Sequence, residues 1–154
     1  MAQRNWLITG VSSGFGRHMT EQLLERGDHV GTVRKIEAMD DLKARYGDLL
    51  WLANLEMTDT PAIRPVVDKA FNELGKIDVV VSNAGYGLIG AAEEVTDEQV
   101  IPQINTNLIG SIQLVRAALP YLRRRAADES SSSTQWVARS RSPVDQCTTR
   151  ASGG

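Results

Sequence analysis

The sequence has little cysteine, no excess of either charge and no long hydrophobic run. Its single cysteine, Cys147, excludes an internal disulfide bond and a metal cluster built on several cysteines. Lys and Arg number 17 against 19 Asp and Glu, a net charge of −2, so no basic stripe can follow a nucleic acid backbone. No apolar run approaches the roughly 18–20 residues of a membrane span. The start of the chain lacks the pattern of a secretion signal, so we expect a cytoplasmic protein that binds neither nucleic acid nor membrane.

What the chain does have is a glycine-rich stretch near its start. The apolar run Trp6–Thr9 stops at a glycine, and an amphipathic pattern then predicts a helix over Phe15–Arg26. Between them, Gly10 allows a tight turn, Gly14 lets a ligand approach the backbone, and Gly16 lets the helix pack closely on the strand. The helix N-terminus offers free N–H groups to a pyrophosphate. An ordinary strand-to-helix turn can use the same glycines, so the argument rests on the position of the motif between a strand and a helix.

The rest of the pattern alternates apolar runs with amphipathic segments. Further strands are predicted at His29–Val33, Leu49–Ala53 and Ile77–Val81, and helices at Glu37–Tyr46, from Pro61 to about Leu74, after a cap at Thr96, and over Leu108–Leu122. This alternation without long loops predicts an α/β fold with a doubly wound parallel sheet of the Rossmann type. One buried apolar stripe is predicted on the last helix, formed by Leu108, Ile109, Ile112, Val115, Leu119 and Leu122.

The residue after the second strand bears on cofactor choice. In dinucleotide-binding folds the residue at this position contacts the adenosine ribose. An acidic side chain accepts a hydrogen bond from the 2′-hydroxyl of NAD, whereas an arginine donates two hydrogen bonds to the 2′-phosphate of NADP. Here Val33 is followed by Arg34, which predicts NADP and makes NAD the less favoured cofactor. The alternative is that Arg34 and Lys35 form a solvated strand end.

Three motifs, taken in order, resemble the short-chain dehydrogenase/reductase family. They are Thr9–Gly16 with the pattern T-G-x-x-x-G-x-G, Asn83–Gly85 with the pattern N-A-G, and Asn105–Gly110. The resemblance covers residues 1 to about 125. It implies a sheet ordered 3-2-1-4-5-6-7 and an oxidoreductase that transfers hydride between a nicotinamide cofactor and a small carbonyl or alcohol substrate. Intact members of the family are commonly homo-oligomers.

The resemblance also implies roles for particular residues. Asn107 matches a member of the family's catalytic tetrad, which relays protons through water; the alternative is an amide that satisfies helix backbone. Glu56 stands where the family usually has an aspartate that touches adenine. The cofactor-binding positions carried over are Gly10, Ser12, Ser13, Gly14, Phe15, Gly16, Arg34, Glu56, Asn83, Ala84 and Gly85. No metal ligands are predicted.

The catalytic tyrosine and lysine of the family, in the pattern Y-x-x-x-K, have no match in this sequence. The residues four places after Tyr46, Tyr86 and Tyr121 are Leu50, Gly90 and Arg125. We therefore expect a chain that is truncated and inactive although its family is enzymatic. The alternative is a non-catalytic dinucleotide-binding or interaction fragment.

From residue 126 the periodic pattern stops. Residues 126–154 are polar and serine-rich, which predicts a disordered tail, whereas 1–125 form an incomplete Rossmann-type domain that ends after the fourth strand and its following helices. A shift of reading frame near residue 125 is an interpretation that explains this change. With favourable degenerate bases, the codons of Cys147–Gly153 read from their third base give Tyr-His-Ala-Ser-Lys-Trp, which contains the missing Y-x-x-x-K pattern.

Overall fold

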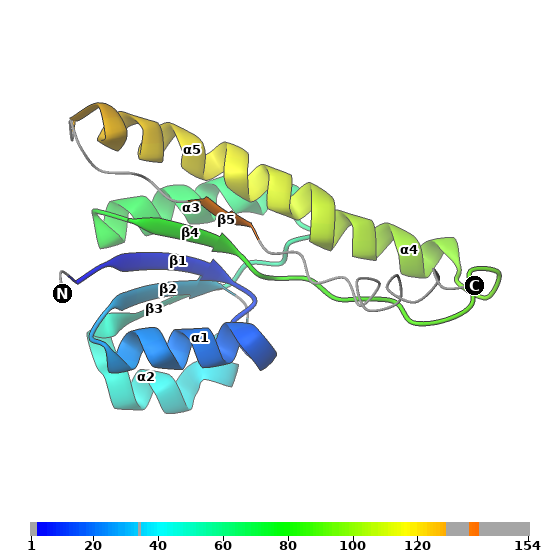
Figure 1. Ribbon diagram of the computed structural model, residues 1–154, viewed down its shortest axis with the longest axis horizontal. Coiled ribbons are helices and arrows are strands. Elements are labelled where there is room, and N and C mark those ends of the chain that lie inside the picture. Colours follow the sequence, from blue (N-terminus) through cyan, green and yellow to red (C-terminus); the bar gives the residue numbers. More distant parts are fainter. Residues whose placement is uncertain (1–2, 34, 129–135, 139–154) are drawn as a thin grey trace, which may run out of the picture.

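The computed structural model describes residues 3–33, 35–128 and 136–138. Its centre is a parallel sheet of five strands in the order β3-β2-β1-β4-β5 (Figure 1). The strands are β1 (Asn5–Thr9), β2 (His29–Val33), β3 (Leu50–Ala53), β4 (Val79–Ser82) and β5 (Trp136–Ala138). The helices are α1 (Gly14–Glu25), α2 (Asp40–Tyr46), α3 (Thr60–Leu74), α4 (Asp97–Ile104) and α5 (Ser111–Asp128). The doubly wound parallel sheet predicted from the sequence is confirmed.

Helices cover both faces of the sheet, with α1 and α2 on one side and α3 and α5 on the other (Figure 1). The strands read as continuous apolar runs because both of their faces are buried. In β4, Val79 and Val81 pack in the core under α1 and α2, whereas Val80 packs in the core under α3 and α5. All three valines are at most 5% exposed, so β4 holds the two cores together.

Two helices depart from the continuous α-helical pattern. The helix predicted over Glu37–Tyr46 consists of a 3-10 turn, Ile36–Met39, followed by α2. Between α4 and α5 lies a π-helical segment, Asn105–Gly110, so the two helices form one long rod (Figure 1).

The apolar stripe predicted on the last helix is wrong in its first half. Leu108, Ile109 and Ile112 are 52%, 36% and 45% exposed. The π-helical segment has a wider turn than an α-helix, so a spacing of three and four residues counted through it does not stay on one face. Of the other predicted positions, Leu122 is buried and Val115 and Leu119 are half-buried. The buried face of α5 is made by Leu114, Ala117, Ala118 and Leu122.

The described sheet carries one strand more than the four predicted from the sequence. Trp136–Ala138 forms β5, which pairs in parallel with Val80–Ser82 of β4. A strand of three residues is too short to show an alternating pattern, which is why the sequence did not indicate it. The α5 helix extends to Asp128, beyond the predicted domain end at 125. The remainder of the predicted tail lies outside the described residues.

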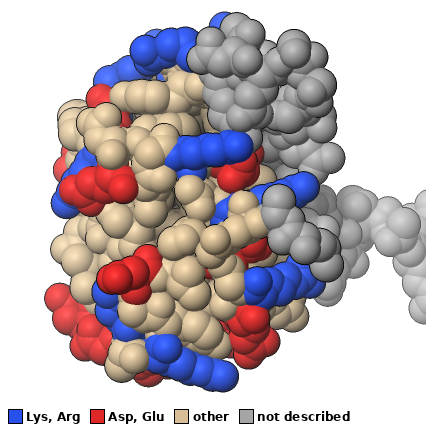
Figure 2. Space-filling model, turned by 90° about the vertical axis from the view of Figure 1, so that its left-hand side faces the viewer, with Lys and Arg blue, Asp and Glu red and all other residues tan. Residues whose placement is uncertain are grey.

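Charges of both signs are mixed on the surface at the amino ends of the strands (Figure 2). One charged contact joins two helices: the Arg17 guanidinium in α1 bonds to Glu21 at 2.7 Å and to Asp41 in α2. The bond from Arg17 holds the pKa of the Asp41 carboxyl below its ordinary value. Within the described ranges, no helix combines the length and the apolar character needed to cross a membrane.

Candidate functional site

The glycine-rich turn between β1 and α1 requires glycine at each of its three motif positions. Gly10 and Gly14 have φ values of +69° and +55°, in the left-handed region that disfavours other residues. A Cβ atom on Gly10 would lie 2.7 Å from the Cα atom of Ala84. A Cβ atom on Gly16 would collide with the carbonyl oxygen of Gly10 and the side-chain amide of Asn83. Gly10 and Gly16 are therefore fixed by contacts inside the protein.

Gly14 differs from these two because it faces open space. A Cβ atom built on Gly14 would have no atom within 4 Å. Ser13, which precedes the first turn of α1, makes no side-chain cap hydrogen bond, and both Ser13 and Phe15 are exposed. The first turn of α1 therefore presents backbone N–H groups to an opening, an arrangement that suits an anionic group such as a diphosphate.

A second part of the site joins the ends of β1 and β4. The Thr9 hydroxyl accepts hydrogen bonds from the backbone N–H groups of Asn83 and Ala84, each at 3.1 Å. The Asn83 side-chain amide donates to the carbonyl oxygens of Thr9 at 3.0 Å and Gly10 at 2.9 Å. The Asn83 side chain thus holds the turn in place. The role of Thr9, which is 1% exposed, was not predicted from the sequence. Its signal is a hydroxyl residue at the strand end directly before Gly10.

Asn107 lies in the π-helical segment and binds the loop that follows β4. Its Oδ1 atom accepts from the backbone N–H of Tyr86 at 3.0 Å, and its Nδ2 atom donates to the Tyr86 carbonyl at 2.7 Å. Gln103 donates to the same carbonyl at 3.2 Å. A Cβ atom on Gly85 would lie 2.9 Å from Asn107 Oδ1. The Asn107 side chain therefore satisfies backbone groups of the loop after β4 and not backbone of its own helix.

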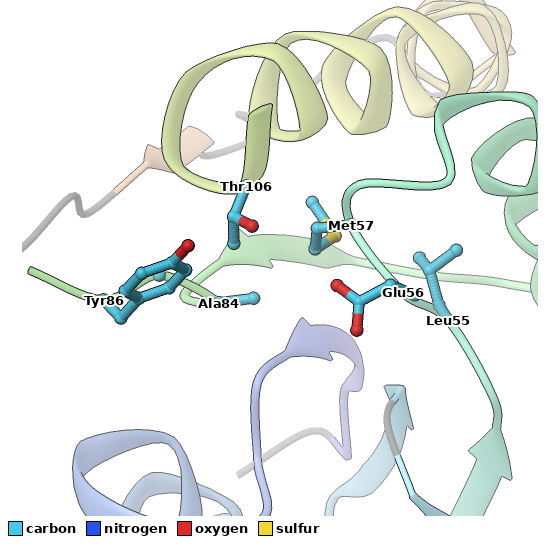
Figure 3. Close-up of a pocket in the computed structure, with 7 residues that line it drawn as sticks. Leu55, Glu56, Met57, Ala84, Tyr86 and Thr106 are labelled. Atoms are coloured by element: carbon cyan, nitrogen blue, oxygen red, sulfur yellow. The ribbon is translucent and has the colours of Figure 1, made fainter. Parts of the chain in front are cut away.

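A pocket of about 80 Å³ opens between these parts at the carboxyl ends of β3 and β4 (Figure 3). Its lining combines the predicted residues Glu56, Ala84 and Gly85 with four that the sequence did not single out, Leu55, Met57, Tyr86 and Thr106. Leu55, Met57 and Thr106 are buried, whereas Glu56 is exposed. The pocket therefore combines apolar side chains with polar groups that include one carboxylate, features that suit a flat ring carrying an amino group.

Neither Arg34 nor Tyr121 adds a described contact to this arrangement. Arg34 is outside the described residues. Tyr121 lies in the contact between α5 and α3, where its ring stacks on Phe71 with the centroids 4.3 Å apart and its hydroxyl donates to Asp68 at 2.8 Å. This hydrogen bond raises the pKa of Tyr121, the opposite of what a proton donor near neutral pH requires.

The chain belongs to the short chain dehydrogenase family, whose model matches residues 4–129. It is 39% identical over 119 residues to a 3-ketodihydrosphingosine reductase of Bacteroides thetaiotaomicron, covering 77% of this chain and 42% of the relative. It is 34% identical over 116 residues to an NADP-dependent 3-hydroxy acid dehydrogenase of Escherichia coli, covering 74% of this chain and 47% of that protein. The chain thus spans less than half the length of these curated relatives.

Solved structures give the same assignment. A short-chain dehydrogenase from Streptomyces avermitilis superposes with a TM-score of 0.81 at 36% identity, over 89% of this chain and 48% of the other. Serine dehydrogenase complexed with NADP+ gives a TM-score of 0.73 at 32% identity, covering 79% of this chain and 50% of the other. A 3-ketoacyl-(acyl-carrier-protein) reductase from Brucella melitensis complexed with NADH gives a TM-score of 0.76 at 27% identity, covering 81% of this chain and 52% of the other.

Proposed function

We propose that this chain supplies the dinucleotide-binding half of an oxidoreductase that transfers hydride between NADP(H) and a carbonyl or alcohol substrate. The observation that carries the proposal is the opening at Gly14, because a turn that is otherwise tightly packed leaves room at the helix N-terminus. The pocket at the ends of β3 and β4 lies on the same edge of the sheet. Ligands of open α/β sheets bind at this edge.

Each part of the site takes one part of the cofactor in this proposal. The cofactor's diphosphate lies against the backbone of the turn formed by Gly10, Ser12, Ser13, Gly14, Phe15 and Gly16. Its adenine and ribose lie against Glu56, Ala84 and Gly85, where the Glu56 carboxylate accepts a hydrogen bond from the adenine amino group. Asn83 acts on this site through the backbone of Thr9 and Gly10. When bound, the cofactor supplies the hydride.

NADP preference is the finer part of the proposal, and it rests on Arg34. Val33 pairs with Thr9 in the sheet, so β2 ends at the edge where the glycine-rich turn begins, and Arg34 is the next residue in the sequence. A charge-assisted contact to the 2′-phosphate is worth about 1.5–3 kcal/mol, or roughly ten- to hundredfold in affinity. We expect NADPH to bind more tightly than NADH by this factor, and R34A to abolish the difference. Equal affinities in the unmodified chain would contradict the assignment.

Catalysis is expected to be absent from the 154-residue chain, because the sequence contains no Y-x-x-x-K pattern. In a complete enzyme we assign Asn107 to the catalytic tetrad. The test is an assay of NADPH oxidation with a panel of aldehydes and ketones, run beside a binding titration. Binding without turnover agrees with the proposal, whereas carbonyl reduction by the purified chain would contradict it.

We further propose that the sequence after residue 125 reflects a disruption of the reading frame. The match to the family model, which stops at residue 129, supports this interpretation. The test is the nucleotide sequence over codons 120–154 and several hundred bases beyond. A shifted frame that encodes Y-x-x-x-K and continues open agrees with the proposal. The absence of such a frame would overturn it and would make the binding fragment the preferred function.

A further inference from the structure

Two hydroxyls, on the buried Ser82 and the half-buried Ser111, connect the end of β4 to the π-helical segment. The Ser82 hydroxyl donates to the Ser111 hydroxyl at 2.9 Å, and the Ser111 hydroxyl donates to the carbonyl oxygen of Asn107 at 2.9 Å. A carbonyl oxygen has no proton to offer, so the single hydroxyl proton of Ser111 must point to Asn107. Ser82 must therefore supply the proton of the other bond. The result is a directed chain of hydrogen bonds from the sheet to the carbonyl of Asn107.

The Ser111 hydroxyl and the Ser111 backbone N–H bond to different carbonyls of the π-helical segment. In an α-helix the N–H of Ser111 would bond to the carbonyl four residues earlier, which is that of Asn107. Here that N–H bonds to the carbonyl of Leu108 instead. The Ser111 hydroxyl thus bonds to the carbonyl that the Ser111 N–H would reach in an α-helix. A π-helical turn is less favourable than an α-helical one, and a side-chain bond of this kind compensates part of the difference.

The π-helical segment contacts both walls of the pocket. On one side, the Asn107 amide holds the N–H and the carbonyl of Tyr86. On the other side, Gly110 lies so close to Met57 that a Cβ atom on Gly110 would be 2.7 Å from the Met57 carbonyl oxygen. Tyr86 and Met57 both line the pocket. The conformation of this segment therefore sets the distance between the two walls.

We propose that Ser111, oriented by Ser82, is a positioning residue that fixes the π-helical segment so that Asn107 reaches Tyr86. Neither serine lines the pocket, so both act on it through Asn107. The proposal about the loop is independent of any ligand. Its consequence for the cofactor rests on the proposed dinucleotide site: a pocket whose loop wall is loose binds adenine more weakly.

The direct test is hydrogen exchange of the Tyr86 amide in the 154-residue chain, because this N–H donates to Asn107. We expect S111A to speed exchange at Tyr86 by about fivefold, the factor that corresponds to one neutral hydrogen bond. S111T keeps the hydroxyl and is expected to restore slow exchange. S82A keeps the hydrogen bond from the Ser111 hydroxyl to the Asn107 carbonyl, so its effect on exchange at Tyr86 is expected to be smaller than that of S111A. T20V is the matched control, because it removes a buried hydroxyl that has no partner within the described part of the chain.

The second measurement is the affinity of the same variants for NADPH. S111A is expected to weaken binding by about fivefold, and S111T and T20V to leave it unchanged. If the unmodified chain binds no NADPH, the proposed function fails, and the exchange at Tyr86 still decides the role of Ser111. Unchanged exchange at Tyr86 in S111A would overturn the inference. So would an equal increase at the amides of β1, which indicates general destabilisation. If S111A does not fold, S111C takes its place, because a thiol is a weaker donor than a hydroxyl; unchanged exchange at Tyr86 in S111C would then overturn the inference.

Discussion

Replacement of Gly14 by alanine adds one methyl group at the point where the glycine-rich turn is open. With φ at +55°, the alanine costs about 1–2 kcal/mol of stability through backbone strain, and it meets no atom within 4 Å. The methyl group occupies the space assigned to the diphosphate. We therefore expect G14A to fold but to bind NADPH at least about tenfold more weakly, a loss of about 1.4 kcal/mol.

Two further variants distinguish the effect of backbone strain on NADPH binding from the effect of filling the space at the turn. Gly27 lies just beyond the other end of α1 with φ at +80° and also has no atom within 4 Å of a built Cβ, so G27A carries similar strain far from the turn. G16A forces a collision with Gly10 and Asn83 and is expected to cost about 1–3 kcal/mol through overpacking. Urea unfolding gives the stabilities and an NADPH fluorescence titration gives the affinities. The reasoning is refuted if G14A binds NADPH as well as G27A does.

Three more predictions concern contacts inside the protein. G110A places a Cβ atom 2.7 Å from the Met57 carbonyl oxygen and should cost about 1–3 kcal/mol in urea unfolding; a cost under about 0.5 kcal/mol would contradict the close contact. T20V removes a buried hydroxyl without a partner among the described residues, so stability should stay level or rise by up to about 1 kcal/mol, and a clear loss would show a missed hydrogen bond. Arg17 lowers the folded-state pKa of Asp41, so the carboxylate stabilises the fold at neutral pH, and this contribution disappears as the pH falls below about 4. The stability difference between the unmodified chain and D41N should therefore shrink between neutral and acidic pH, and a constant difference would contradict the pairing.

The strands were predictable because burial on both faces leaves a continuous apolar run, as in Val79–Val81. The buried face of α5 was not predictable, because the π-helical segment breaks the regular helical period on which the prediction depended. Local sequence carries no clear signal for that segment, which is held by contacts such as Ser82 with Ser111. Trp136–Ala138 escaped prediction because a strand this short is defined by its partner and not by its own pattern.

The site was predictable where a residue type is required by the backbone. Gly10 and Gly16 have no room for a side chain, and the sequence showed both. The wall formed by Tyr86 was not evident, because Tyr86 contributes its backbone to the hydrogen bonds with Asn107. Backbone contributions of this kind leave no preference for a residue type. The place of Thr9 between two strand ends likewise becomes clear only when β1 and β4 are adjacent.

The central claim is that this chain binds a nicotinamide dinucleotide at the turn between β1 and α1. The most direct test is an NADPH titration of the isotopically labelled 154-residue chain, followed by the amide resonances of the turn and the pocket. The account predicts saturable shifts at Gly10, Gly14, Gly16 and Gly85, with the core of α3 unchanged. An absence of shifts at these glycines at millimolar NADPH, in a chain shown to be folded, would contradict it.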